Sequence, residues 1–426
     1  MEAFLFWCRA AVCVLPLVLV APAMAQQADN TGLLGDWGGL RPVLAAHGIS
    51  IGVTDSENLL GNLSGGIKTG ATLQGLTTMT MDVDTGKAFG LQGGALHVSA
   101  LQLHGRPLSP YYLGTLQTAN GNEGDSASRL WELWYDQAFL AGRFDIKIGQ
   151  QSIDNEFIGS TYSGLFVNTM AGWPIIPSAD LYGGGPAYPL SSLGVRGRFM
   201  PNGNTSILAG VFDDDPGGGS FTQDQQALDQ RGGRFSLKNG ALWIAELQHS
   251  TKLLGLPGTY KFGGWYDSGS FADELYGYNH RGNYSLYAVM DQTIWQAPRN
   301  SNRTLNVFGR IMGAPNDRNL VDFGFNGGIT LTAPLPGRGN DQAGLDVGIA
   351  HVSSRAADAA VAAGGRRPGT ETLIEATYQA QAVSWLVLQP DIQYVLNPAG
   401  GINNPDGSGK RLGNELVVGL RGIVTF

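Results

Sequence analysis

The feature that most constrains the fold of this chain is an alternation of charged and large apolar side chains in short segments. Residues 144–148 read Phe-Asp-Ile-Lys-Ile, and residues 194–199 read Gly-Val-Arg-Gly-Arg-Phe. A strand points successive side chains to opposite faces, so these segments place charge on one face and hydrocarbon on the other. Beyond the first 25 residues, no apolar run approaches the roughly 18 residues that a spanning helix needs. If the chain enters a membrane, it does so as strands.

The same period of two recurs along the chain and is interrupted by clusters of Gly, Asn, Asp and Pro. In the C-terminal segment ELVVGLRGIVTF, Leu416, Leu420 and Phe426 share one face and Arg421 lies on the other. Charged residues make up only 15% of the chain, and this low share together with the many aromatic residues argues against disorder. A soluble sandwich rarely sets so many charges opposite its buried face. We therefore predict an all-β transmembrane antiparallel β-barrel.

The N-terminal 25 residues have the pattern of a secretory signal peptide. Arg9 precedes an apolar run, which ends before Ala23-Met24-Ala25. Cleavage there starts the mature chain at Gln26 and removes both cysteines of the sequence, so neither a disulfide nor a thiolate metal site is expected. A short helix is predicted from Leu40 to His47. The expected organisation is a signal peptide (1–25), an N-terminal segment with a short helix (26–48) and an outer-membrane barrel (49–426).

Several classes of function are disfavoured by the sequence. The net charge of −8 provides no basic surface for nucleic acid. Residues 48–52 have the spelling of a nucleophile elbow but not the strand before it and the helix after it. The six histidines form no metal-type pair, and Asp213, Asp214 and Asp215 are interpreted as solvated turn acids because a calcium loop requires stricter spacing. We predict no enzyme, no cofactor and no metal.

Blocks spread over the chain carry a family resemblance. They are LLGDWGGLRPVLAAHGI from Leu33, RLWELWYDQAFLAGRFDIKIGQQSIDNEF from Arg129, FVNTMAGWP from Phe166, GGPAYPLSSLGVRGRF from Gly184, GVFDDDP from Gly210, GNYSLYAVMDQTIW from Gly282, and ETLIEATYQAQAVSWLVLQPDIQYVLNPAG from Glu371. In this order they resemble carbohydrate-selective porins of the OprB type, although the turns at Ser384 and Ala399 depart from the family's pattern. The resemblance implies a Gram-negative outer-membrane barrel of 16 strands whose lumen passes monosaccharides and related polyols by passive diffusion.

The candidate constriction follows from the chemistry of sugars. Their hydroxyls both donate and accept hydrogen bonds and their ring faces are apolar, so Arg, carboxylates and aromatic rings suit a selective pore. Alternation places five cations toward the lumen: Arg143, Lys147, Arg196, Arg198 and Arg421. It also places Glu132 and Asp136 on one face with Trp134, with Glu246 and Glu375 as weaker candidates. We expect Arg143, Arg196 or Arg198 to hold the sugar together with Glu132 or Asp136. The alternative is that these charges only solvate the wall.

Other interpretations remain open at this stage. Trp131 and Tyr135 are predicted to face lipid, as part of an aromatic girdle. A non-selective pore would share the same barrel. A soluble periplasmic β-rich glycosidase could use Glu132 and Asp136, but residues four apart on a strand are separated by about 13 Å, too far for either glycosidase geometry. The expected partners are small neutral sugars, outer-membrane lipid and lipopolysaccharide, and the barrel-assembly machinery that reads the terminal Phe426. A homo-oligomer and a monomer both remain open.

Overall fold

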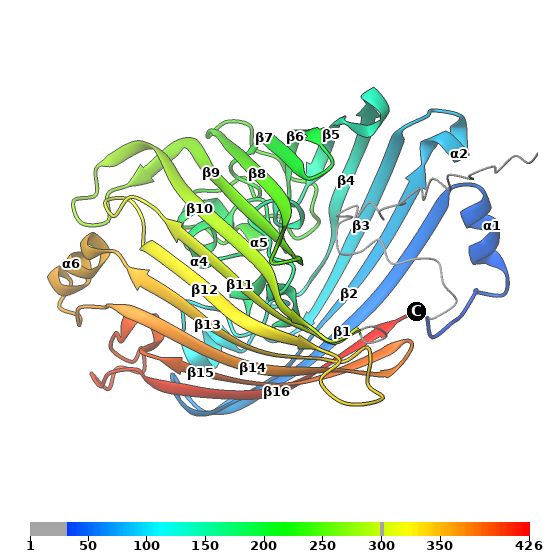
Figure 1. Ribbon diagram of the computed structural model, residues 1–426. Coiled ribbons are helices and arrows are strands. Elements are labelled where there is room, and N and C mark those ends of the chain that lie inside the picture. The colour runs from blue at the N-terminus through cyan, green and yellow to red at the C-terminus, as the bar shows by residue number, and fades with distance from the viewer. Residues whose placement is uncertain (1–31, 299–301) are drawn as a thin grey trace, which may run out of the picture.

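Segments of alternating polarity pair edge to edge until the sheet closes. In the computed structural model, which describes residues 32–298 and 302–426, sixteen antiparallel strands follow chain order and β1 pairs with β16 (Figure 1). The strands are β1 Ile49–Gly66, β2 Gly70–Asp84, β3 Gly94–Gly105, β4 Ala127–Phe139, β5 Phe144–Gln151, β6 Ser192–Asn202, β7 Thr205–Asp213, β8 Ala241–Leu253, β9 Leu256–Ala272, β10 Asn279–Gln296, β11 Thr304–Gly313, β12 Val321–Thr332, β13 Gln342–Val352, β14 Thr370–Val383, β15 Leu386–Leu396 and β16 Gly413–Thr425. The predicted fold and strand number are confirmed.

Helices are short and lie either before β1 or in the connections between strands. The predicted N-terminal helix is present as α1, Leu40–Ala46, whereas the predicted signal peptide lies outside the described residues. No described helix is long and apolar enough to cross a membrane. The others are α2 Thr85–Phe89, α3 Thr169–Gly172, α4 Ile175–Asp180, α5 Gln225–Leu228 and α6 Ser354–Ala362.

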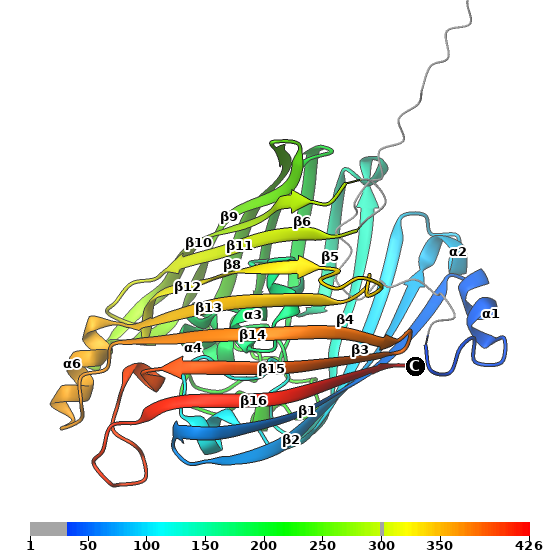
Figure 2. The same ribbon diagram turned by 60° about the horizontal axis from the view of Figure 1, so that its bottom comes forward.

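The two ends of the barrel differ in the length of their connections. At the end that holds α1, α2 and the C-terminus, neighbouring strands such as β6 and β7 or β8 and β9 are joined by tight turns (Figures 1 and 2). The opposite end carries the long connections, among them residues 106–126, 152–191, 214–240, 353–369 and 397–412. Outer-membrane barrels have short periplasmic turns and long extracellular loops. The long-loop end is therefore the extracellular end.

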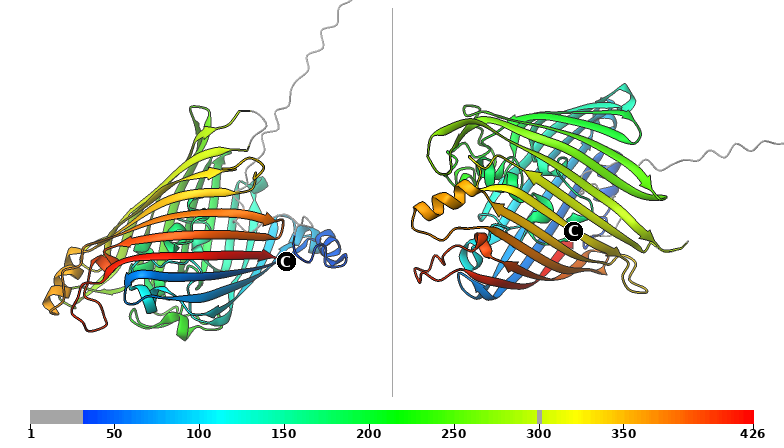
Figure 3. Two further views of the ribbon diagram at one scale, coloured as in Figure 1. Left: turned by 90° about the horizontal axis from the view of Figure 1, so that it is seen from below. Right: turned by 60° about the vertical axis from the view of Figure 1, so that its left-hand side comes forward.

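Long connections fold back into the barrel and occupy part of its interior, among them segments 106–126 and 152–191 (Figures 1 and 3). Residues of segment 152–191, including those of α3 and α4, pack in a hydrophobic cluster against inward side chains of β7 to β13. Wall glycines make room for this contact: a Cβ on Gly344 would lie 2.6 Å from the Phe166 ring, and one on Gly324 would lie 2.9 Å from Ile175. The interior of the barrel is thus filled along β7 to β13, while the inner wall of β4 to β6 carries charged side chains.

The acidic run at the end of β7 is buried, which corrects the expectation of solvated turn acids. Asp213 accepts a hydrogen bond from the backbone NH of Ser236 at 3.0 Å, and Asp214 accepts one from Gly240 at 3.1 Å. Asp215 binds the NH of Gly219 at 3.0 Å. These carboxylates fix the 214–240 connection, because an irregular segment has backbone donors that need acceptors.

Candidate pore constriction

Carboxylates of the barrel wall bind the inward-folded segment 152–191. Asp291 on β10 accepts hydrogen bonds from Ser160 Oγ at 2.6 Å, from Thr161 N at 2.9 Å and from Tyr162 N at 3.2 Å. Segment residues 152–168 pass along the wall from β5 to β16 in this way, and we name them the inner belt. Wall donors bind its carbonyls as well: Lys261 reaches Gly159 O at 2.7 Å.

Two of the predicted sugar acceptors are part of this attachment. Glu246 receives the NH of Ile158 at 2.7 Å, and Glu375 receives the NH groups of Val167 at 2.6 Å and Asn168 at 3.2 Å. Both carboxylates are fully buried. They face inward as the alternation predicted, but their oxygens hold backbone rather than lining the open lumen. Sequence alternation identifies the inward face and cannot say whether a second segment covers it.

Two inward arginines also join wall to inner segments. Arg421 donates to Asn58 at 2.7 Å, to Asn120 at 3.0 Å and to the carbonyl of Val167 at 3.4 Å. Its predicted inward orientation is therefore correct, but it bridges the inner belt and segment 106–126. Arg310 on β11 was not predicted. It donates to Gly172 O at 2.7 Å. The sequence feature that could have identified Arg310 is that it is the single charged residue of its strand, TLNVFGRIMG.

Ion pairs line the inner wall of β4, β5 and β6, where the inner belt begins. The strands β4, β5 and β6 place Asp136 opposite Lys147, Lys147 opposite Arg196, and Asp145 opposite Arg198. Glu156 of the inner belt joins them. We call these six residues the charged cluster: Asp136, Asp145, Lys147, Glu156, Arg196 and Arg198.

Arg196 lies at the centre of the charged cluster. Its Nε is 2.6 Å from Glu156 Oε2, its Nη2 is 3.4 Å from Asp136, and it also pairs with Asp145. Lys147 makes an ion pair with Glu156, and Arg198 Nε is 2.7 Å from Asp145. Three cations therefore balance three carboxylates. Burial opposes the charge on Glu156, but Lys147 and Arg196 outweigh it and hold the pKa of this carboxyl at about 2, so Glu156 is ionised at neutral pH.

An aromatic surface adjoins the charged cluster. The Trp134 ring stacks on His97, with centroids 4.8 Å apart and planes inclined by 14°, and the Lys147 ammonium lies 4.3 Å from its centroid. His97 in turn contacts Asp82 at 2.7 Å. The neighbouring Glu132 is buried and accepts the NH of Ser152 at 3.1 Å, so it anchors the start of the inner belt.

Arg143 does not belong to the constriction, which corrects the prediction. Strand β5 begins only at Phe144, so the alternation that assigned Arg143 to the lumen does not extend to it. The side chain is exposed in the β4–β5 turn at the periplasmic end, where it donates to the carbonyl of Pro201 at 2.9 Å.

The predicted lipid-facing position of Trp131 is also wrong. Register shifts between the β3 pairs of Leu130 and Glu132, which is a β-bulge. The extra residue turns the Trp131 indole inward, where its NH donates to Leu190 O at 3.2 Å and its ring meets Tyr188 edge to face. A bulge exchanges the inward and outward positions of the residues on either side of it, and no sequence pattern predicts this bulge.

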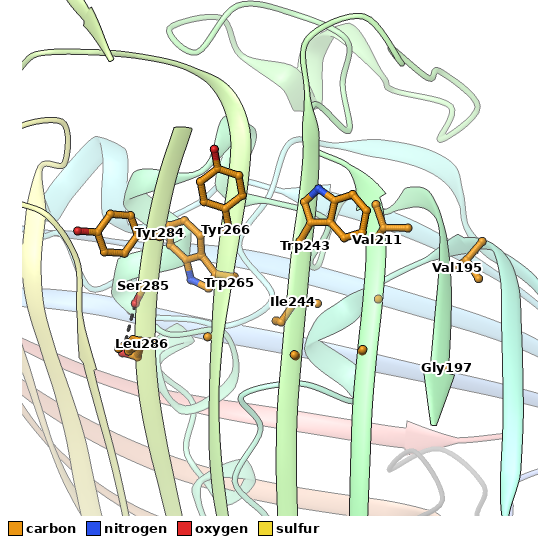
Figure 4. A pocket seen from close by; sticks show the side chains of 14 residues that line it. Val195, Gly197, Val211, Trp243, Ile244, Trp265, Tyr266, Tyr284, Ser285 and Leu286 are labelled. Atoms are coloured by element: carbon orange, nitrogen blue, oxygen red, sulfur yellow. Dashed lines mark hydrogen bonds between the residues drawn. The ribbon is translucent and has the colours of Figure 1, made fainter. Parts of the chain in front are cut away.

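A hollow of 580 Å³ in the wall lies on the opposite side of the sheet from the charged cluster (Figure 4). Its floor is a row of small residues in register, Gly197, Ala209, Ala245 and Gly264. The exposed side chains of Trp243, Tyr266 and Tyr284 lie along its rim. The hollow faces away from the lumen, so it does not lie on a solute path.

The family model described as "Carbohydrate-selective porin, OprB family" matches residues 68–426. The chain belongs to this OprB family. Porin B of Pseudomonas aeruginosa is 23% identical over 454 residues, covering 94% of this chain and 92% of the relative. The putative porin QuiX of Acinetobacter baylyi is 24% identical over 419 residues, covering 87% and 90%. Like other OprB-family barrels, the chain is an outer-membrane porin.

The fold is likewise that of a solved OprB barrel. The high-pH structure of Pseudomonas putida OprB matches with a TM-score of 0.81 and 21% identity, covering 94% of this chain and 99% of that chain. The outer-membrane channel DcaP of Acinetobacter baumannii matches with a TM-score of 0.52 at 11% identity, covering 89% and 97%. At these identities the likeness concerns the fold alone.

Segment 106–126 contains a carboxyl group that we expect to respond to pH. Glu123 accepts hydrogen bonds from Ser109 Oγ at 3.0 Å and from the NH groups of Ser109 and Leu108. Burial raises its pKa from 4.5 to about 7, against the opposing effect of these donors. A raised carboxyl pKa stabilises the packed segment fully below pH 4.5 and loses that contribution as pH rises through 7. Amides of residues 106–126 should therefore exchange hydrogen faster at pH 8 than at pH 5, beyond the intrinsic rate change.

Glu123→Gln is the matched control, since glutamine keeps the size and one acceptor but cannot ionise. In this variant, the additional pH dependence should vanish. Equal pH dependence in the wild type and the variant would show that Glu123 does not titrate in this range.

Proposed function

We propose that residues 1–25 are a cleaved signal peptide, and that the mature chain from Gln26 passes monosaccharides and related polyols passively into the periplasm. The charged cluster carries this proposal. Three cations and three carboxylates on one side of the lumen give no excess of either sign, whereas a ring of one sign would select ions. A neutral solute with many hydroxyls suits such a surface best.

The partly exposed members of the charged cluster supply the contacts. Arg198 is 29% exposed and offers a planar set of NH donors to sugar oxygens. Asp136 and Glu156, 20% and 18% exposed, accept hydrogen bonds from sugar hydroxyls. Trp134 offers part of an apolar ring surface to a sugar ring. Each contact competes with an existing ion pair, so the solute is bound weakly and can leave, as conduction requires.

The surroundings of the barrel complete the proposal. Its apolar outer face would contact outer-membrane lipid and lipopolysaccharide, and the terminal Phe426 suits recognition by the barrel-assembly machinery. We propose a passive channel without enzymatic chemistry, cofactor or nucleic-acid partner. The alternative is a non-selective pore, in which the charged cluster only solvates the wall.

Flux into liposomes tests this proposal. Protein-loaded liposomes should admit neutral sugars of glucose size faster than amino-acid zwitterions of equal size, because a zwitterion must compete with fixed charges of both signs at once. Swelling rates over a panel of matched sizes provide the measurement. Equal permeation of sugars and zwitterions would reduce the function to that of a general pore.

A further inference from the structure

A second hollow, of 530 Å³, lies at the extracellular end, between the 214–240 connection and the ends of β9 and β10. We call it the rim hollow. Its volume falls within the range of roughly 300–1,000 Å³ that small-molecule sites occupy. The side chains that line it include an aromatic ring, hydroxyls, an amide and an ammonium group: Phe221, Thr222, Ser236, Ser270, Asn239 and Lys238.

Phe221 offers the rim hollow an apolar ring in a fixed position. Its ring meets Tyr182 edge to face, with centroids 5.2 Å apart and planes inclined by 80°, and meets Phe271 at 5.9 Å and 73°. Tyr182 and Phe271 are buried, with centroids 5.3 Å apart. The Phe221 side chain rests on this buried pair and is nonetheless 40% exposed. Part of its ring surface is therefore free to contact a ligand.

Three polar groups beside this ring are available to a ligand. Within the described residues, neither the hydroxyls of Thr222 and Ser236 nor the Lys238 ammonium makes a hydrogen bond or an ion pair. Hydroxyl groups both donate and accept hydrogen bonds, and an ammonium group donates up to three. The rim hollow can therefore exchange several hydrogen bonds with a polar ligand without breaking contacts of its own.

The frame of the rim hollow is fixed by buried carboxylates. Asp213 accepts a hydrogen bond from the backbone NH of Ser236 at 3.0 Å, and Asp215 accepts one from Gly219 at 3.0 Å. These contacts hold both the first and the last part of the 214–240 connection. A site that is formed before the ligand arrives loses little conformational freedom on binding.

The mixed lining matches the surface of a sugar. A sugar ring has apolar faces for an aromatic ring and hydroxyls that both donate and accept hydrogen bonds. Among the described residues, Asp215 and Lys238 are the two charged groups of the lining, and their charges balance. An ion of either sign would find no excess of opposite charge, and an apolar ligand would leave the hydroxyl and ammonium groups unpaired.

We propose that the rim hollow binds a saccharide at the extracellular end of the barrel. The sugar ring stacks on Phe221, and its hydroxyls bind Lys238 and the hydroxyls of Thr222 and Ser236. The inference deepens the proposed function, because it adds an external saccharide site to the pore. Two ligands share this chemistry: a free monosaccharide, and the saccharide part of lipopolysaccharide.

Fluorine NMR of the full chain in detergent micelles, with 4-fluorophenylalanine in place of phenylalanine, tests this proposal. The Phe221 resonance is the one that Phe221→Leu removes, and titration with D-glucose or with purified lipopolysaccharide should shift it until it saturates. Phe89 is the matched control, because its side chain is 69% exposed on α2 at the periplasmic end. Its resonance, assigned through Phe89→Leu, should stay in place.

A lysine variant tests the polar contact. Lys238→Met keeps the length of the side chain and removes the charged donors, so half of the shift should require a severalfold higher ligand concentration. Lys252→Met is the matched control, because Lys252 is exposed on β8 near the periplasmic end. This variant should titrate like the wild type.

Each outcome decides the proposal. A saturable shift of the Phe221 resonance supports it, and the ligand that causes the shift identifies the source. An unchanged resonance with both ligands would overturn it, as would a shift equal to that of Phe89 or an equal response to glutamine, a zwitterion of similar size. Selective sugar flux into liposomes with an unresponsive Phe221 would refute this site and leave the pore intact, whereas a responsive Phe221 with non-selective flux would do the reverse.

Discussion

Replacing Asp291 by alanine should detach the inner belt and raise single-channel conductance severalfold, with loss of the preference for sugars over zwitterions. One carboxylate holds three successive residues, Ser160, Thr161 and Tyr162. Hydrogen bonds to a charged group contribute roughly 1.5–3 kcal/mol each. Their joint loss also leaves two backbone donors without partners, so the belt should leave the wall. Planar-bilayer conductance and sugar block measure the effect.

Two comparisons separate detachment from general damage to the barrel. Asp291→Asn keeps one acceptor oxygen and should have a smaller effect. Met290→Ala alters the adjacent, outward-facing position of the same strand and should leave conductance unchanged. If Asp291→Ala conducts and blocks like the wild type, the other wall contacts of the belt and its hydrophobic packing suffice to hold it, and this carboxylate is dispensable.

The strands could be predicted because their pattern reflects a local physical requirement. Alternation from Phe144 to Ile148 and around Arg196 records water on one face and hydrocarbon on the other, and the structure places Lys147, Arg196 and Arg198 accordingly. No such pattern describes residues 152–168, because side chains far away in the sequence, and not a neighbouring strand, bind their backbone. The contacts of Asp291 and Glu246 with the belt join residues about 90–130 positions apart, and a single sequence contains no signal for such pairs.

Local exceptions account for the remaining errors. The bulge at Trp131 turns one side chain to the opposite face. Strand β5 begins at Phe144, so Arg143 lies outside its alternation. Arg310 lies on a strand whose inward face also carries the apolar Phe308 and Met312, so charge does not alternate regularly with apolar residues along it. In each case the alternation of inward and outward side chains holds for the strand as a whole. An exception at a single residue then determines where its side chain lies.

Replacing Arg196 by alanine should make the pore cation-preferring and weaken sugar block. The charged cluster would then hold two cations against three carboxylates, and Glu156 and Asp145 would each lose a partner. Removal of one partner from a buried ion pair typically costs about 3–5 kcal/mol, so some local rearrangement that widens the path is expected. The reversal potential in a salt gradient reports the ion preference, and the reduction of current by added sugar reports the block.

Arg196→Lys and Arg143→Ala distinguish charge, shape and position. Lysine restores the charge balance and should return the reversal potential to the wild-type value, yet sugar block should recover only in part because an ammonium cannot span Glu156 and Asp136 as the planar guanidinium does. Arg143→Ala removes an equal charge from the periplasmic turn and should change neither quantity. If Arg196→Ala retains both the wild-type reversal potential and sugar block, the charged cluster only solvates the wall, and selectivity arises from the extracellular connections.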